Sequence, residues 1–183
     1  GYWGCEDVDT DSTAYNKWRD MLRRCYNPKV HEKYPEYIGC IVSEEWKSFS
    51  NFRYWYEKNN YGGSNLNLDK DILYKGNKQY SPDTCCLVPG FINTLFTNGK
   101  ANRGELPLGV YKEEKNGITC YRACMAVSSK SIKLGTFKTP EEAFQKYKEY
   151  KEQYIKDTAK RYKDKIPYSV YEAMMNWKVE ITD

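Results

Sequence analysis

Two stretches in the first half of the chain repeat hydrophobic residues at the spacing of an α-helix. Within residues 11–27, hydrophobic residues occur at i, i+3, i+7 and i+10 from Tyr15, a spacing that puts them on one face of a helix with 3.6 residues per turn. Ser12 or Thr13 can cap the start of such a helix, and Ser43 can cap the second stretch, residues 43–59. The pattern predicts two amphipathic helices whose stripes form an aromatic core: Tyr15, Trp18, Leu22 and Cys25, then Trp46, Phe49, Phe52 and Tyr56.

The segments around these helices carry turn and strand signals. Residues 28–40 are interrupted by Pro28, Pro35 and Gly39, which predicts a loop. We predict a short strand over residues 68–74 and a turn over residues 75–79. Residues 80–89 are predicted to form a second strand or the start of a helix. A short helix over 90–98 precedes the small and polar residues of 99–107. We expect a domain boundary there, near residue 100.

The second half of the chain changes to the period-2 alternation of strands. Residues 108–113, 118–127 and 131–137 are short runs, and Asn116-Gly117, a strong hairpin dipeptide, separates the first two. Thr139 then caps a long helix with Pro140 at its first position. A short helix over 168–177 and a strand-like run over 178–181 follow. The pattern predicts an α+β fold with domains over 1–99 and 100–183, the second a three-stranded antiparallel sheet packed on one long helix.

Composition agrees with a folded, water-soluble protein. Hydrophobic residues make up 40% and charged residues 30%, and no apolar run approaches the roughly 20 residues that span a bilayer. We therefore expect no membrane partner. The 7 cysteines form no regular framework, which favours reduced thiols in a cytoplasm. The chain has no signal-like start, and since it opens on Gly1 rather than Met, we expect residues upstream.

The net charge of +4 is unevenly distributed. Residues 100–165 carry 16 Lys and Arg against 9 Asp and Glu, whereas the rest of the chain carries 13 and 16. A basic second half favours a polyanionic partner there. The alternative is that these charges belong to solvated helix faces.

Residues 106–155 resemble an AP2-type DNA-binding domain. The matching positions include a fairly specific string that crosses from the last strand into the helix: Gly109-Val110, Tyr121-Arg122-Ala123, Leu134-Gly135-Thr136-Phe137, Pro140-Glu141-Glu142-Ala143 and Tyr147. In that family the sheet lies in the DNA major groove and the helix packs on its back. The resemblance therefore implies double-stranded DNA as the partner.

Alternation divides the expected sheet into two faces. The helix side takes Val110, Ala123, Met125, Ile132 and Leu134. The open side takes Tyr111, Glu113, Arg122, Cys124, Ala126, Ser131 and Lys133.

Basic residues on the open face and in its turns can reach phosphates or guanine edges. We expect the nucleic-acid-binding residues to be Tyr111, Lys112, Lys115, Arg122, Lys130, Ser131 and Lys133. Plant members of the family crowd this face with Arg and Trp, whereas Glu113, Cys124 and Ala126 stand here. This departure favours general duplex binding over tight sequence-specific readout. The alternative is that another part of the chain covers the open sheet.

Residues 13–95 resemble a phage-type HNH endonuclease domain. The order of the matching motifs carries the resemblance: Trp18, Met21-Leu22, Arg24-Cys25-Tyr26-Asn27, Tyr37-Ile38-Gly39, Val42, Trp46, Phe49, Phe52, Leu68-Asp69-Lys70-Asp71, Gly76-Asn77 and Tyr80-Ser81-Pro82-Asp83-Thr84-Cys85. An HNH domain followed by an AP2 domain is similar to the free-standing homing-type endonucleases of bacteriophages. The resemblance implies a small helical and ββα unit that cuts DNA with a divalent metal ion such as Mg²⁺.

The HNH resemblance also implies roles for individual residues. Asp69 or Asp71 would bind the metal and serve catalysis, and Asn77 would be the central Asn. Asp83 or Thr84 would lie near the last metal ligand. The His that activates water in this family is missing from the strand that should carry it.

Two other side chains could replace the missing base. His31 is the single His of the chain, and a lone loop His is more often solvated than catalytic. Lys70 stands between two carboxylates, which would raise the pKa of its amine and disfavour it as a base. The alternative interpretation of residues 68–73 is a surface strand with solvated acids.

Four cysteines of the first half could in principle form a structural zinc site. Their spacing contains no clean C-x₂-C pair, and Cys is among the most buried residue types. We therefore expect plain burial in the core rather than Zn²⁺ binding for Cys25, Cys40, Cys85 and Cys86.

Three functions from different classes stay open. The first is metal-dependent nicking or cleavage of duplex DNA by a homing-type phage endonuclease in the host cytoplasm. The retained Asp69, Asp71 and Asn77 favour this function. The second is binding of DNA or a host target by a catalytically inactive protein with a degenerate HNH scaffold. The missing His favours this function. A phage-encoded inhibitor with a host or phage protein as partner is a third class.

Overall fold

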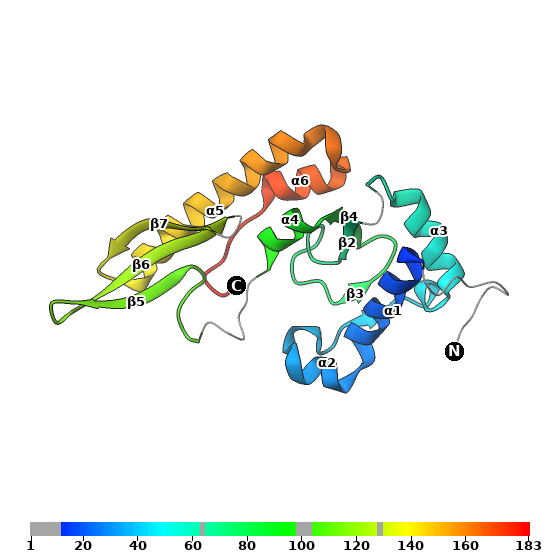
Figure 1. Ribbon diagram of the computed structural model, residues 1–183, viewed down its shortest axis with the longest axis horizontal. Coiled ribbons are helices and arrows are strands. Elements are labelled where there is room, and N and C mark those ends of the chain that lie inside the picture. The colour runs from blue at the N-terminus through cyan, green and yellow to red at the C-terminus, as the bar shows by residue number, and fades with distance from the viewer. Residues whose placement is uncertain (1–11, 63–64, 98–103, 128–129) are drawn as a thin grey trace. The chain divides into compact units, whose positions relative to one another are not determined.

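Two compact units make up the chain in a computed structural model, which describes residues 12–62, 65–97, 104–127 and 130–183 (Figure 1). The first unit runs to residue 97 and includes residues 166–173. The second runs from residue 98 to 165 and includes residues 174–183. The boundary expected near residue 100 lies outside the described residues. No helix in the described part of the chain is long and apolar enough to cross a membrane.

Side-chain caps determine where the first helices of the first unit begin. Ser12 accepts a hydrogen bond from the backbone N–H of Tyr15 and starts α1 (Thr13–Tyr26). Asn27 accepts from the N–H of Lys29 and starts α2 (Pro28–Lys33), with Pro28 in the first turn. The loop predicted over 28–40 is therefore wrong in its first part. The 3₁₀ turn η1 (Pro35–Tyr37) follows α2.

The second predicted helix is broken near its start. The 3₁₀ turn η2 (Glu45–Lys47) comes first, and Ser48 is extended, with φ −84° and ψ 125°. The α-helix α3 (Phe49–Asn59) begins only after it. The prediction of one helix from residue 43 is wrong, but the aromatic core is confirmed, since Trp46, Phe49, Phe52 and Tyr56 are all buried.

Short strands complete the first unit. The strand β1 (Ile41–Val42) pairs in parallel with β3 (Gln79–Tyr80), and β2 (Leu66–Asp69) pairs antiparallel with β4 (Cys86–Pro89). The short helix α4 (Gly90–Asn93) contacts both β2 and β4, and η4 (Thr94–Phe96) follows it. The strand predicted over 68–74 is wrong, because β2 ends at Asp69 and the chain turns there.

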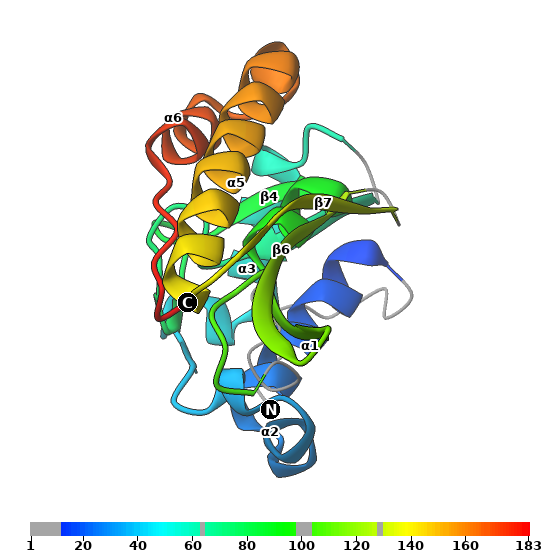
Figure 2. The ribbon, with the colours of Figure 1, turned by 90° about the vertical axis from the view of Figure 1, so that its left-hand side faces the viewer.

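The second unit is a three-stranded antiparallel sheet packed against a long helix, as predicted. Its strands are β5 (Val110–Lys115), β6 (Ile118–Val127) and β7 (Lys130–Phe137), in the order β5-β6-β7. The two-residue turn between β5 and β6 has positive φ at both positions, 53° at Asn116 and 75° at Gly117. The long helix α5 (Pro140–Tyr162) lies along one face of the sheet (Figure 2). The α+β class is therefore confirmed.

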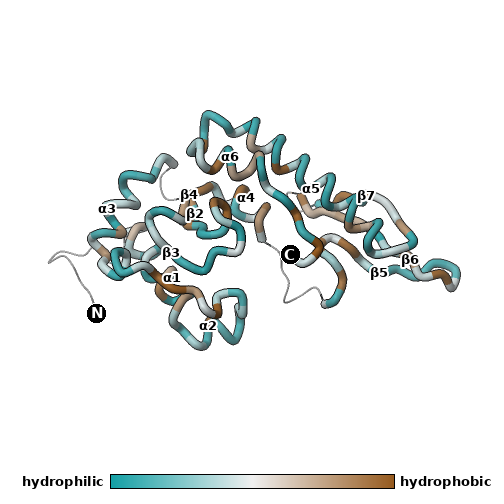
Figure 3. The backbone as a smooth tube through the Cα atoms, turned by 180° about the vertical axis from the view of Figure 1, so that it is seen from behind, coloured by the Kyte–Doolittle hydropathy of each residue, from teal (hydrophilic) through white to brown (hydrophobic). Residues whose placement is uncertain are grey.

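A capping box begins α5. Thr139 accepts from the backbone N–H of Glu142, whose carboxylate accepts from the N–H of Thr139 in return. The helix is mostly hydrophilic along its length, with short hydrophobic segments (Figure 3). Three buried side chains in its first part pack in the sheet core: Ala143, Phe144 and Tyr147.

The end of the chain has little regular structure. The turn η6 (Lys163–Lys165) and the helix α6 (Tyr168–Asn176) follow α5. The strand predicted over 178–181 is wrong, because residues 177–180 have no regular structure and a turn follows. Val179 is buried nonetheless, and Lys148 and Glu152 of α5 hydrogen-bond its backbone C=O and N–H.

Candidate functional site

The first predicted metal ligand, Asp69, organises the turn that follows β2. Its Oδ1 accepts hydrogen bonds from the backbone N–H groups of Asp71, over 2.7 Å, and Ile72, over 2.8 Å. Burial raises the pKa of the Asp69 carboxyl above its ordinary value, while the two N–H groups oppose that shift. One oxygen of this carboxylate therefore stabilises the backbone rather than a ligand.

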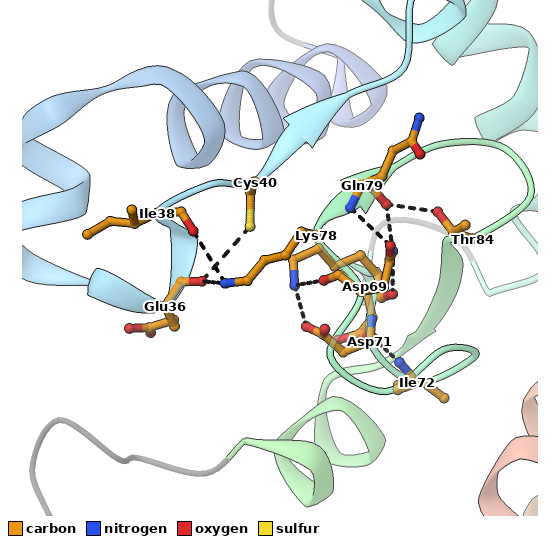
Figure 4. A network of polar contacts seen from close by, with 11 residues as sticks. Glu36, Ile38, Cys40, Asp69, Asp71, Ile72, Lys78, Gln79 and Thr84 are labelled. Carbon is orange, nitrogen blue, oxygen red and sulfur yellow. Dashed lines mark hydrogen bonds and ion pairs between the residues drawn. The ribbon is translucent and has the colours of Figure 1, made fainter.

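Lys70 links the second predicted ligand to the predicted central Asn. Its Nζ lies 2.6 Å from Oδ2 of Asp71 and donates to the backbone C=O of Asn77 over 2.8 Å (Figure 4). The residue is buried, with 6% of its surface exposed. A buried cation of this kind needs such partners. The amine is thus held inside the loop between a carboxylate and a carbonyl.

The side chain of Asn77 closes the same loop. Its Nδ2 donates to the backbone C=O groups of Lys70, over 2.9 Å, and Gln79, over 2.6 Å, and its Oδ1 accepts from the N–H of Gln79. Asn77 therefore holds its loop in place through these contacts with Lys70 and Gln79.

The remaining predicted ligand positions lie in the turn after β3. Asp83 is exposed there, and Thr84 Oγ1 donates to the backbone C=O of Gln79 over 2.8 Å. Asp69 and Asp71 thus share one turn, but Asp83 does not form a group with them. Across the described ranges, no three His, Cys, Asp or Glu side chains gather in a group that could hold a metal ion.

His31 lies on α2 rather than in a loop. Its Nε2 is 2.8 Å from the backbone C=O of Arg24, near the end of α1. A carbonyl oxygen only accepts, so this nitrogen carries a proton and donates. The contact gives His31 a structural role between two helices.

The expected burial of the four cysteines is confirmed. Cys25, Cys40, Cys85 and Cys86 are buried and free, at most 6% exposed. Desolvation raises the pKa of the Cys25 and Cys85 thiols to about 12, so both are uncharged at neutral pH.

The sheet of the second unit presents the other predicted site on the face opposite α5. Tyr111 on β5 lies opposite Arg122 on β6, and Lys133 on β7 lies opposite Cys124. Ser131 lies opposite Ala126 in the same alternation. Tyr111, Ser131 and Lys133 are exposed, and Arg122 is partly exposed. These four predicted residues share one face.

Three expectations about this sheet need correction or refinement. Cys124 is buried, 7% exposed, although its register places it on the open face of the central strand. Lys112 is not in a turn but inside β5, opposite Tyr121, whose ring packs in the core beneath α5. Lys112 therefore belongs to the helix side. Lys115 and Lys130 lie at strand ends beside turns, but Lys130 is opposite Val127, whose side chain packs in the core beneath α5, so Lys130 also belongs to the helix side.

The open face contains an ion pair that the sequence reasoning missed. Arg122 Nη1 lies 2.9 Å from Glu113 Oε1, and the guanidinium carbon lies 5.6 Å from the centre of the Tyr111 ring. Lys115 Nζ is 3.9 Å from the other Glu113 oxygen. The predicted DNA-reading Arg is thus partly neutralised within the sheet.

The hairpin register was the signal that could have revealed this pair. A two-residue Asn-Gly turn places Lys115 opposite Ile118, and therefore Glu113 opposite Cys120 and Tyr111 opposite Arg122. Glu113 and Arg122 are then diagonal neighbours on one face, within reach of long side chains.

The fold and these contacts define an α+β protein with a loop held by internal polar contacts in one unit and a partly basic open sheet in the other. Comparison with protein-family models, with curated proteins and with solved structures returns no match.

Proposed function

We propose that the protein binds duplex DNA through the open face of the β5-β6-β7 sheet. The observation that carries this proposal is the exposure of Tyr111, Ser131 and Lys133, with Arg122 beside them, on the face that α5 leaves uncovered. The resemblance of residues 106–155 to an AP2 domain supports the same face. The excess of basic residues over 100–165 supports a polyanionic partner.

The chemistry of this face favours backbone contacts over base readout. Lys133 and Lys115 can each neutralise a phosphate. Arg122, the best candidate for a bidentate contact to guanine, already pairs with Glu113. Cys124 and Ala126 bring no strong hydrogen-bond donor to the centre of the face. The protein therefore binds many duplex sequences with similar affinity.

Duplex binding is tested with a variant that removes both central cations, Arg122→Ala with Lys133→Ala. We expect the dissociation constant for a mixed-sequence duplex to rise roughly tenfold or more. The matched control is Lys146→Ala with Lys160→Ala, which removes the same charge from exposed positions of α5. Equal affinity of the wild type and the sheet variant would overturn the proposal, and so would equal losses in the sheet and control variants.

For the first unit we infer a non-cleaving role on an HNH-like scaffold. The side-chain hydrogen bonds of Asp69, Lys70, Asp71 and Asn77 run within residues 69–79, the loop and the first residue of β3. His31 donates through Nε2 to a carbonyl, so this nitrogen is not a free base. The loop is thus stabilised by the residues that the resemblance assigns to catalysis.

Metal-dependent nicking is the second candidate function. The observation that favours it is that Asp69 and Asp71 each use one carboxylate oxygen in these contacts, which leaves a second oxygen on the same turn for a hard cation such as Mg²⁺.

A supercoiled-plasmid assay separates the two candidates. The wild type, Asp71→Ala and the control Asp20→Ala are incubated with Mg²⁺ or Mn²⁺ and with EDTA. Under the non-cleaving proposal no protein nicks the plasmid, although the wild type still shifts it on a gel. Nicking that requires the metal and is lost only in Asp71→Ala would overturn the non-cleaving role. A plasmid that is neither shifted nor nicked would contradict both DNA functions and favour a protein partner.

A further inference from the structure

One face of α1 lies at the edge of the core of the first unit, where Leu22 is only partly buried. The buried residues of this helix are Ala14, Tyr15, Trp18, Met21 and Cys25. Between them, positions 19, 22, 23 and 26 repeat at i, i+3, i+4 and i+7 and share a second face. Arg19, Arg23 and Tyr26 are exposed there.

The turn after α1 makes this face concave. Asn27 both ends α1 and caps α2, so the second helix begins without an intervening loop. Lys29 and Glu32, three residues apart on α2, line the other side of the concavity. Its volume is about 820 Å³.

The residues that line the concavity combine cationic side chains with an apolar floor. The lining holds the three cations Arg19, Arg23 and Lys29 and one acid, Glu32, while Leu22 and the Tyr26 ring supply the apolar surface. Arg23 also lies 3.5 Å from Asp20, which is outside the lining. Half of the Tyr26 surface is exposed. Its hydroxyl accepts a hydrogen bond from the backbone N–H of Val42 over 3.0 Å, which holds the ring in place.

We propose that this concavity binds single-stranded DNA. The three cations contact successive phosphates, and an unpaired base stacks on the ring of Tyr26, the combination that single-strand-binding surfaces use. Bases within a duplex are already stacked and paired, so they cannot use this ring. The proposal goes beyond duplex binding by the sheet and stands without it, because all the residues involved belong to the first unit.

The test measures the binding of a fluorescently labelled oligo-dT strand by anisotropy. The charge variant is Arg23→Glu with Lys29→Glu, and its matched control is Arg53→Glu with Lys58→Glu on exposed positions of α3. The stacking variant is Tyr26→Leu, and its control is Tyr54→Leu, which removes an exposed ring on α3. Circular dichroism verifies that every variant is folded.

We expect the charge variant and Tyr26→Leu each to weaken oligo-dT binding by roughly tenfold or more, while both controls bind nearly as the wild type does. Unchanged oligo-dT binding in Tyr26→Leu or in the charge variant would overturn the proposal. Losses in Arg53→Glu with Lys58→Glu as large as those in the charge variant would overturn it too.

Paired measurements separate this proposal from duplex binding by the sheet. Arg122→Ala with Lys133→Ala should lower duplex affinity and leave oligo-dT binding intact, whereas Tyr26→Leu should do the reverse. If the sheet variant alone fails to change duplex binding, the sheet proposal is wrong and the concavity proposal stands.

Discussion

Glu113 limits how strongly Arg122 can contact a phosphate, since the two side chains already pair over 2.9 Å. Glu113→Gln removes the competing charge, so we expect tighter duplex binding and a salt dependence steeper by about 0.9 in log–log slope, as for one more phosphate contact. The matched control is Glu114→Gln, an exposed position opposite Thr119 on the other face of β5. Equal gains in both variants would indicate net charge alone and contradict the role of the pair.

Asp69 gives the first unit a pH dependence of known sign. Because burial raises its pKa in the folded state, the folded protein binds a proton more readily than the unfolded chain does. The free energy of unfolding therefore falls as the pH rises from the ordinary carboxyl pKa of 3.8 through the raised value. Asp69→Asn keeps the Oδ1 acceptor, and its free energy of unfolding should not show this decrease with pH.

Urea unfolding at a series of pH values between 3.8 and neutrality measures the effect. The stability of Asp69→Asn relative to the wild type should increase with pH. A constant difference between Asp69→Asn and the wild type across the series would contradict the assignment.

At the scale of elements, the packing of β5 on α5 depends on a glycine. Gly109 has φ +76°, and a Cβ there would lie 2.1 Å from Cδ2 of the buried Tyr147 ring. Gly117, in the β5-β6 turn, has φ +75° and open space around it. Both Gly→Ala changes carry the strain of a left-handed backbone, about 1–2 kcal/mol.

Gly109→Ala should cost about 1–3 kcal/mol more than Gly117→Ala, because the ring must move as well. Urea unfolding followed by circular dichroism compares the two variants. Equal losses of stability would mean that the sheet and α5 do not approach as closely as the structure describes.

Elements that depend on neighbouring residues were predictable from the sequence, and those that depend on distant contacts were not. The Thr139 cap and the Asn116-Gly117 turn are local, and both were predicted correctly. The break at Ser48 and the turn at Asp69 were missed, because the helix and strand patterns continue through both positions. Asp69 ends its strand because its side chain accepts hydrogen bonds from two backbone N–H groups. Such side-chain bonds compete with strand pairing, and the alternation of hydrophobic residues does not reveal them.

In the candidate site, too, local features were predictable from the sequence and features that depend on distant contacts were not. Alternation placed Tyr111, Arg122, Ser131 and Lys133 on one face correctly, because the β5-β6 register pairs the first two and the β6-β7 register beyond its shift at Ala123 and Cys124 keeps the other two in phase with them. The buried state of Cys124 was not predictable from alternation, nor was the concavity between α1 and α2, which depends on the unexpected helix after Asn27.

At the scale of the whole molecule, the uneven charge distribution predicts that the duplex binding we propose for the second unit depends on salt concentration. Residues 100–165 hold 16 of the 29 basic residues, and the phosphate contacts we propose come from one face of one sheet. Each Lys or Arg that neutralises a phosphate adds about 0.9 to the steepness of log affinity against log salt concentration.

The most direct test of the account is this salt dependence, measured by anisotropy with a mixed-sequence duplex for the wild type, Arg122→Ala with Lys133→Ala, and Lys146→Ala with Lys160→Ala. We expect affinity to fall steeply with salt for the wild type. The slope should become shallower by about 1–2 in the sheet variant and stay unchanged in the α5 control. A wild-type affinity that does not depend on salt, or a sheet variant with the wild-type slope, would contradict duplex binding through this face.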